Sequence, residues 1–156
     1  WCLRNLMTEV RKAFSRSLYN KSDKTAKNII SEYLIKSQGH SLVNDVENYY
    51  ADLQTFKEGK EYYHEAEMKY SWRGDWPTHW GEIRIPSRKK RLLEKYSNER
   101  LTFYVISGDE QRFWKISSDT LRESPVKEAS NRYIDKGETF FHIPVSNADL
   151  ISINTA

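Results

Sequence analysis

The chain has 156 residues, of which 38% are hydrophobic and 13% aromatic, and its formal net charge is +3. A chain of this length is typical of one domain that buries its own core. A single cysteine, Cys2, excludes an internal disulfide framework and a cysteine-rich zinc site. Neither a signal-peptide pattern nor an apolar run of the roughly 18 residues that a membrane helix needs is present. We therefore expect an intracellular protein without a membrane partner.

Charge is distributed unevenly along the chain. Residues 37–72 carry mostly acidic side chains, whereas residues 1–36 and 73–100 carry mostly basic ones. Carboxylates can hold a divalent cation, and lysine and arginine can hold phosphates. The pattern favours a metal-using protein that acts on a polyanion. Such blocks also arise by chance on unrelated faces, so the pattern alone does not establish nucleic-acid binding.

Two helices are predicted in the N-terminal quarter of the chain. Apolar residues at helical spacing predict an amphipathic helix over 2–19. A second helix is expected to begin near Ser22 or Asp23, both good N-cap residues, and to stop at Gly39. We interpret residues 1–21 as an N-terminal helix appended to a core domain.

The remainder of the chain has mainly strand character. Strands are predicted over 40–44, 48–56, 61–72, 81–85, 101–107, 112–117 and 139–145. Ser87 is expected to cap a short helix over 88–97, Asp119 to start a helical turn, and Ser146 or Asn147 to cap a helical tail. This order predicts an α/β domain over residues 22–156, with a mixed central sheet flanked by helices.

The second and third of these strands form the most informative hairpin. A tight turn within 57–60 sets a register in which Asp52 lies opposite Glu65, with Glu67 as its diagonal neighbour and Lys69 next on the same face. Opposed Cβ atoms lie about 5 Å apart, so the three carboxylates repel one another unless a cation lies among them. The hairpin therefore predicts a site for one or two divalent cations. A longer, bulged turn would shift the register, and the alternative is a half-buried strand with a solvated charged edge.

The spacing of these acids resembles a known signature. Asp52, then fourteen residues, then Glu67-Met68-Lys69 is similar to the motif of the PD-(D/E)xK nuclease superfamily, the restriction-endonuclease-like fold. In that family a helix precedes a strand meander that carries the acid and the tripeptide, and a helix and further strands follow. The resemblance covers residues 22–145, and Ala51 stands where the family name places proline.

This resemblance implies a DNA nuclease that depends on Mg²⁺, for which Mn²⁺ is expected to substitute. Asp52, Glu67 and the backbone carbonyl of Met68 would hold the metal, which favours oxygen ligands. Metal-bound water would attack the phosphodiester, and Lys69 would orient that water and neutralise the developing charge. Glu32, on the first core helix, is a candidate further metal ligand, because family members often bring a helix glutamate to the site. Its alternative is an ordinary place on the polar face of the helix.

Other residues near the motif have both functional and structural interpretations. Glu65 is either a supporting or second-metal acid or only a neighbour. Five basic residues are candidates to bind DNA phosphates, with a solvated surface as the alternative: Arg73, Arg84, Arg88, Lys89 and Lys90. Three tryptophans at four-residue spacing belong either to a loop that stacks on bases or to a lid that packs on the sheet: Trp72, Trp76 and Trp80.

Two further classes of function stay open. One is a nucleic-acid-binding module on the same fold without catalysis, and the other is an unrelated α/β interaction domain with a solvated charged strand. DNA is the expected partner, with RNA as an alternative. A homo-oligomer is expected because cutting both strands of a duplex commonly takes two active sites.

Overall fold

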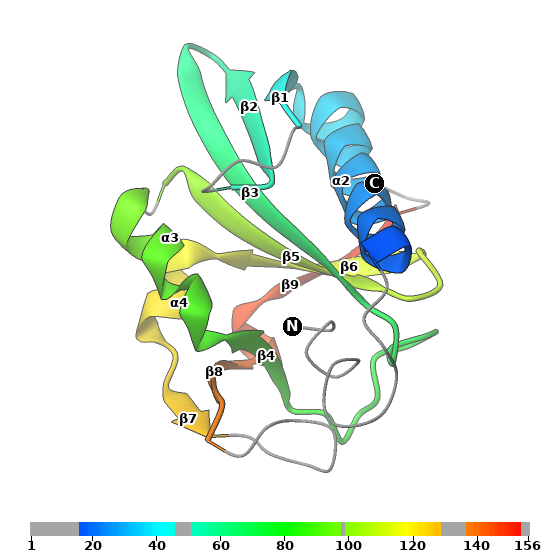
Figure 1. Ribbon diagram of the computed structural model, residues 1–156, viewed down its shortest axis with the longest axis vertical. Helices are drawn as coiled ribbons and strands as arrows, with labels where there is room; N and C mark the ends of the chain where they lie inside the picture. Colours follow the sequence, from blue (N-terminus) through cyan, green and yellow to red (C-terminus); the bar gives the residue numbers. More distant parts are fainter. Residues whose placement is uncertain (1–15, 46–50, 98, 129–136, 154–156) are drawn as a thin grey trace.

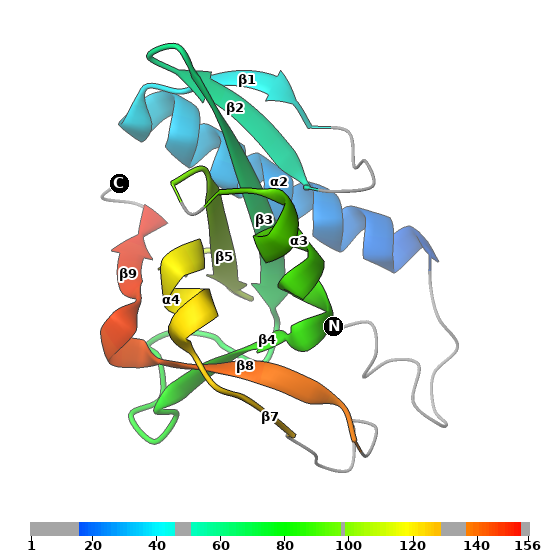
Figure 2. The same ribbon diagram turned by 90° about the vertical axis from the view of Figure 1, so that its left-hand side faces the viewer.

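The computed structural model describes residues 16–45, 51–97, 99–128 and 137–153. It is a mixed α/β fold in which a six-stranded sheet has the long helix α2 on one face (Figure 1). The other face carries a second, three-stranded sheet and two short helices (Figure 2). The α/β class and the mixed central sheet are thus as predicted. Most of the helix expected over 2–19 lies outside the described residues.

Helix α2 spans Arg16–Gln38 without interruption, so the expected helix start near Ser22 or Asp23 is wrong. Both residues cap helices well, but neither prevents a helix from continuing, and no glycine or proline occurs between 16 and 38. The boundary expected between residues 21 and 22 therefore falls inside one helix. The stop was predicted correctly, because Gly39 adopts a left-handed φ of 72° directly after the last turn.

The central sheet is built from six strands. In spatial order they are β1 (Ser41–Asn44), β2 (Leu53–Lys57), β3 (Lys60–Lys69), β5 (Leu101–Ser107), β6 (Arg112–Ser117) and β9 (Asp149–Ser152). Only β3 and β5 pair in parallel, and the other neighbours are antiparallel. The connection from β3 to β5 has to cross over one face, and it carries the strand and helices that begin the second layer.

The second layer lies on the face of the sheet opposite α2. Its strands are β4 (Glu82–Pro86), β8 (Thr139–Pro144) and β7 (Val126–Glu128), and its helical parts are η1 (Ser87–Lys89), α3 (Lys90–Lys95), α4 (Ser118–Glu123) and η2 (Val145–Asn147). Strand β7 was not predicted from the sequence, since its three residues are all exposed. The sheet was expected to be flanked by helices, and this layer is part helix and part sheet.

The C-terminal end of the described chain differs from the prediction. The expected helical tail is a single 3-10 turn, η2, followed by strand β9, which pairs with β6 along the edge of the sheet. Local capping signals favoured a helix there. Pairing with β6 satisfies the backbone of this segment instead, and only the folded sheet provides that partner.

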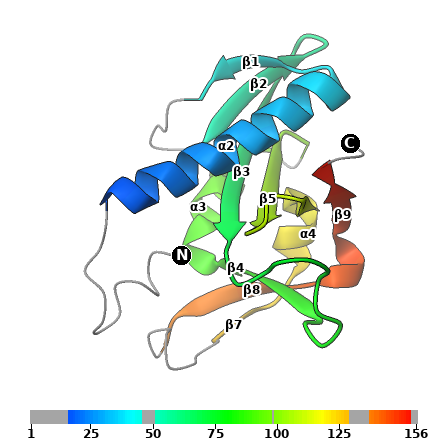
Figure 3. The same ribbon diagram turned by 90° about the vertical axis from the view of Figure 1, so that its right-hand side faces the viewer.

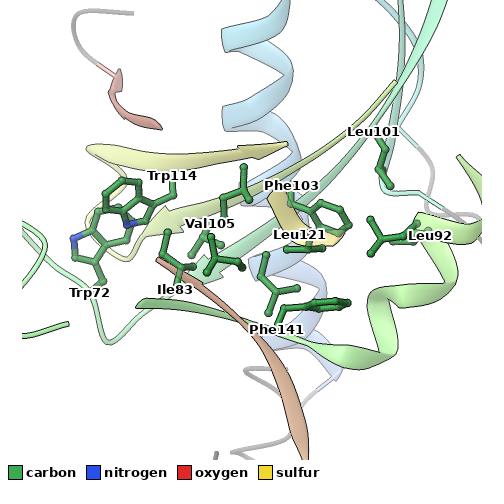
Figure 4. Packing of buried hydrophobic residues seen from close by; sticks show 13 residues of the cluster. Trp72, Ile83, Leu92, Leu101, Phe103, Val105, Trp114, Leu121 and Phe141 are labelled. Atoms are coloured by element: carbon green, nitrogen blue, oxygen red, sulfur yellow. The ribbon is translucent and has the colours of Figure 1, made fainter. Parts of the chain in front are cut away.

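Two clusters of buried side chains, one on each face of the central sheet, hold these layers together. On one face, Ala26, Ile30 and Leu34 of α2 pack against β3, β5 and β6. The other cluster joins the sheet to β4, β8, α3 and α4, and Figure 4 shows its residues, from Trp72 and Trp114 at one end to Leu92 at the other. The carboxylates of β3 lie on the side of this second cluster.

The β2–β3 hairpin has the predicted register. Phe56 pairs with Glu61, and the turn residues Glu58 and Gly59 both have positive φ, 51° and 80°. This is the two-residue turn whose twist matches that of the strands. The strand before it is shorter than expected, because β2 begins only at Leu53. None of the described helices combines the length and the apolar character that crossing a membrane requires.

Candidate functional site

Strand β3 divides its side chains between the two layers. Ala66 and Met68 are buried against α2, in the first cluster. Because side chains alternate along a strand, Glu65, Glu67 and Lys69 face the second layer instead. The charged face predicted from the sequence is therefore turned toward η1 and α3 rather than toward open solvent on a free sheet face.

Asp52 and Glu65 are held side by side by the backbone. Asp52 lies just before β2, and its N–H donates to Glu65 Oε2 at 2.9 Å. In return, the backbone N–H of Ala66 donates to Asp52 Oδ2 at 3.1 Å. These two bonds bring the carboxylates together, as the register predicted. Glu65 is only 4% exposed, so its charge is carried inside the protein.

Lys89 provides the positive charge that faces these acids. Its Nζ lies 2.6 Å from Glu65 Oε1, and its side chain is 13% exposed. Burial acts to lower the pKa of Lys89, but the nearby charges of Glu65, Glu67 and Asp52 together raise it above its usual value. Lys89 therefore stays charged and is within electrostatic reach of all three acids.

The pKa of Asp52 is raised despite the nearby charge of Lys89. Burial, followed by the negative charge of Glu65, raises the pKa of Asp52 to about 8. Lys89 and the Ala66 N–H oppose this shift without cancelling it. At neutral pH the Asp52 carboxyl is therefore mostly protonated in the protein alone. A divalent cation would favour the ionised form, because it supplies positive charge where the carboxylates meet.

The acid that α2 brings near this cluster is Asp23 rather than Glu32. Asp23 forms an ion pair of 3.0 Å with Lys27, and its charge contributes to the raised pKa of Asp52. Glu32 is exposed, pairs with Lys36 at 3.1 Å, and lines a different pocket together with Phe113. The structure thus does not bring Glu32 to the other predicted ligands. Sequence analysis treated Asp23 only as a helix cap.

Lys69 lies beside the tryptophan loop. Its Nζ lies 5.3 Å from the centre of the Trp80 ring, which is a cation–π distance. Trp72, Trp76 and Trp80 pack edge to face in sequence, with ring centres 5.0 and 5.1 Å apart, and Trp76 also contacts Trp114 at 5.5 Å. The tryptophan loop is thus packed on the sheet, and it covers the end of β3 that carries Lys69.

The remaining predicted basic residues lie on the surface. Arg73, Arg84, Arg88 and Lys90 are exposed, and of the five candidates only Lys89 is drawn inward to the acids. Lys89, which was expected to bind phosphate, is therefore the ion-pair partner of Glu65. A run of basic residues at the start of a helix gives no signal as to which one turns inward, so this role follows only from the packing of η1 on β3.

Two of the acids provide ligands of the type that Mg²⁺ favours. Asp52 and Glu67 offer hard oxygen ligands, and Mg²⁺ in enzymes is commonly bound by one or two carboxylates together with water and substrate phosphates. Glu65 is already engaged by Lys89 and by the Asp52 N–H. In the ranges that the structure describes, no group of three or more His, Cys, Asp or Glu side chains is arranged to hold a metal.

Comparisons with protein-family models, with curated proteins and with solved structures gave no match to this chain.

Proposed function

We propose that the chain is a metal-dependent nuclease that uses Mg²⁺, or Mn²⁺ in its place, to hydrolyse phosphodiester bonds in DNA, with RNA as an alternative substrate. The observation that carries this proposal is the pairing of Asp52 with Glu65 beside Glu67, in an inward-facing position where burial, followed by repulsion from Glu65, raises the pKa of Asp52 to about 8. Acids placed in this way favour a cation.

The order of elements supports the same proposal. A helix, α2, precedes the β1–β3 meander, and the meander carries Asp52 and the Glu67-Met68-Lys69 tripeptide. A helix, α3, and the strands β5 and β6 follow. This is the order described above for the PD-(D/E)xK superfamily, and we propose that the chain has the restriction-endonuclease-like fold, with β4, β7 and β8 as an addition.

Each residue of the cluster has a distinct part in the proposed reaction. Asp52 and Glu67, with the Met68 carbonyl, would hold Mg²⁺, which when bound lowers the pKa of a coordinated water and neutralises charge on the scissile phosphate. Asp52 has to release its proton to act as a ligand. Glu65 and Lys89 form an ion pair that fixes the position of the Asp52 backbone. Lys69, whose Nζ lies over the Trp80 ring, would orient the attacking water and neutralise the developing charge.

Cleavage assays with matched variants test this proposal. The purified protein is incubated with linear, nicked, single-stranded and four-way-junction DNA and with RNA, in Mg²⁺, Mn²⁺ or a chelator. We expect metal-dependent cleavage that falls at least about 100-fold in Glu67→Gln and in Lys69→Met. Glu61→Gln is the control, since Glu61 lies on the same face of β3 and is exposed. Intact nucleic acid in every reaction, with a folded protein, would exclude the nuclease.

The Lys89–Glu65 ion pair favours a second candidate, a nucleic-acid-binding module without catalysis. A lysine 2.6 Å from one of the acids already supplies a positive charge to the cluster without a metal. Such a module would bind DNA through its exposed basic residues, equally well in chelator and in Mg²⁺, and Glu67→Gln would leave that affinity unchanged. The proposed homo-oligomer is tested in the same samples by sedimentation.

A further inference from the structure

A second polar site lies on the other face of β3, beneath the end of α2. It is a pocket of about 320 Å³ between the end of α2, the β2–β3 hairpin and the beginning of β5. Figure 3 shows α2 crossing this face of the sheet toward β1. Three basic side chains line the pocket, His40, Lys57 and Lys115, together with Tyr62 and the buried His64. None of these residues belongs to the proposed nuclease site.

A chain of hydrogen bonds joins the two histidines through a threonine. Thr55 Oγ1 lies 2.8 Å from His40 Nδ1 and 2.9 Å from His64 Nε2. Thr55 is fully buried and His64 is 2% exposed. The other ring nitrogen of His64, Nδ1, is enclosed as well and finds no hydrogen-bond partner among the described residues.

This arrangement favours one distribution of the protons. An unpaired N–H inside a protein is rare, which favours a bare Nδ1 on His64 and a proton on its Nε2. His64 Nε2–H then donates to Thr55 Oγ1, and the Thr55 hydroxyl proton is left to donate to His40 Nδ1. Neutral His40 consequently carries its own proton on Nε2. The relay makes His40 a hydrogen-bond donor at the nitrogen that Thr55 does not use.

The basic groups that line the pocket act on one another, and Lys115 Nζ also lies 5.7 Å from the centre of the Tyr33 ring. Burial, followed by the charges of Lys57 and Lys115, lowers the pKa of His40. Burial also lowers the pKa of Lys115, an effect that Lys57 adds to and Asp149, on the neighbouring strand, opposes. Two acids, Glu58 and Glu99, also line the pocket, and both are exposed. Basic groups that lower one another's pKa in this way favour an anion between them, because the anion stabilises their charged forms.

We propose that this pocket binds a small phosphate-bearing anion, held by Lys57, Lys115 and the Nε2–H of His40. Two lysines match the double negative charge of a phosphate monoester or of inorganic phosphate, and the histidine adds a neutral donor. A volume of about 320 Å³ also leaves room beside the phosphate for an organic group such as a nucleoside, against the ring of Tyr62. The shared chemistry is the phosphate, and a mononucleotide is one of its sources.

Binding is measured by calorimetry and by ¹⁵N spectra of the histidine side chains, with chelator present so that no metal links the phosphate to the acidic cluster. The probes are inorganic phosphate, adenosine 5′-monophosphate and adenosine, each against chloride at equal ionic strength. Before any probe is added, His40 and His64 should both show the Nε2–H tautomer. Phosphate and the monophosphate should then shift the His40 signals, whereas adenosine alone should not.

Two substitutions complete the test. Lys115→Gln should weaken phosphate binding by about tenfold or more, which is the loss of one charge-assisted contact. Lys24→Gln, which removes an exposed lysine on α2, should leave it unchanged. Tighter binding of the monophosphate than of phosphate identifies a nucleotide as the ligand, and equal binding identifies phosphate itself. The proposal is overturned if neither anion shifts His40 more than chloride does, or if both variants bind as the wild type does. Neither result bears on metal-dependent cleavage.

Discussion

The two faces of β3 carry clusters of opposite charge, one residue apart in the sequence. On one face Glu65 meets Asp52, and burial and repulsion raise the pKa of Asp52 to about 8. On the other face His64 is linked to His40 near Lys115, and burial, followed by the neighbouring basic groups, lowers the pKa of His64 to about 3. Each cluster is held partly in its neutral form.

A single strand can thus separate two kinds of site, because its side chains point alternately to opposite faces of the sheet. Adjacent residues point to opposite layers, so a carboxylate and a histidine that follow each other in the chain meet different neighbours. In both clusters, a neighbouring group that carries the same sign of charge makes it harder for Asp52 or His64 to ionise. A ligand of opposite charge would relieve this in each case: a divalent cation among the acids and an anion among the bases.

The largest effect should come from removing the lysine of the acidic face. Lys89→Met leaves Glu65 charged and buried without its partner, so we expect a loss of about 3–5 kcal/mol in the free energy of unfolding. Urea denaturation at neutral pH measures it. The double variant Glu65→Gln with Lys89→Met should recover most of the loss, because neither charge is then buried. A loss of less than about 1 kcal/mol in the single variant would contradict a buried ion pair.

The basic face should make the protein sensitive to acid. The pKa of His64 is lowered from 6.5 to about 3, so the unfolded chain binds its proton first as the pH falls. Its contribution is fully present above pH 6.5 and is lost between there and about pH 3, at up to about 1.4 kcal/mol per pH unit. His64→Gln should flatten this part of a stability curve measured by urea denaturation. His79→Gln, at an exposed histidine, is the control; an equal slope in both variants would contradict the prediction.

The acidic face should show the opposite slope. Because the pKa of Asp52 is raised from 3.8 to about 8, the folded protein retains a proton that the unfolded chain has lost. Its contribution is fully present below pH 3.8 and is lost as the pH rises toward 8. Asp52→Asn should therefore be more stable than the wild type near pH 8 without metal, while failing to cleave DNA.

The effect of Mg²⁺ on the melting temperature is a second test of Asp52. At pH 8, Mg²⁺ should raise the melting temperature of the wild type more than that of Asp52→Asn, because only the wild type offers the carboxylate that the cation favours. Calcium-free and magnesium-free buffers provide the baseline. Equal shifts in the two proteins would mean that the cation binds elsewhere.

The smallest effect is expected at Glu32. Its ion pair with Lys36 is exposed, so Glu32→Gln should change the free energy of unfolding by less than about 0.5 kcal/mol. DNA cleavage should be unchanged, since the structure does not bring this residue to the acids of β3. A clear loss of cleavage in Glu32→Gln, with a normal melting curve, would restore it to the site.

Much of the fold follows from local patterns in the chain. Alternating apolar residues located the long strands of the central sheet, and Gly39 marked the end of α2. The turn at Glu58 and Gly59 set the hairpin register, and with it the approach of Asp52 to Glu65. These features are predictable because they depend on residues that are close in sequence.

Other features depend on contacts between distant segments. Strand β9 exists because β6 offers it an edge, although its own residues favoured a helical tail. Asp23 acts on the pKa of Asp52 from helix α2, and Lys89 pairs with Glu65 from η1, so both interactions join segments that are far apart in the sequence. The histidine relay joins Thr55 to two residues on different strands and loops. The sequence by itself thus determined which charges each strand face would carry, because alternation is a local property. Only the tertiary structure decided which partners those charges meet, because burial and long-range contacts set the partners of a side chain.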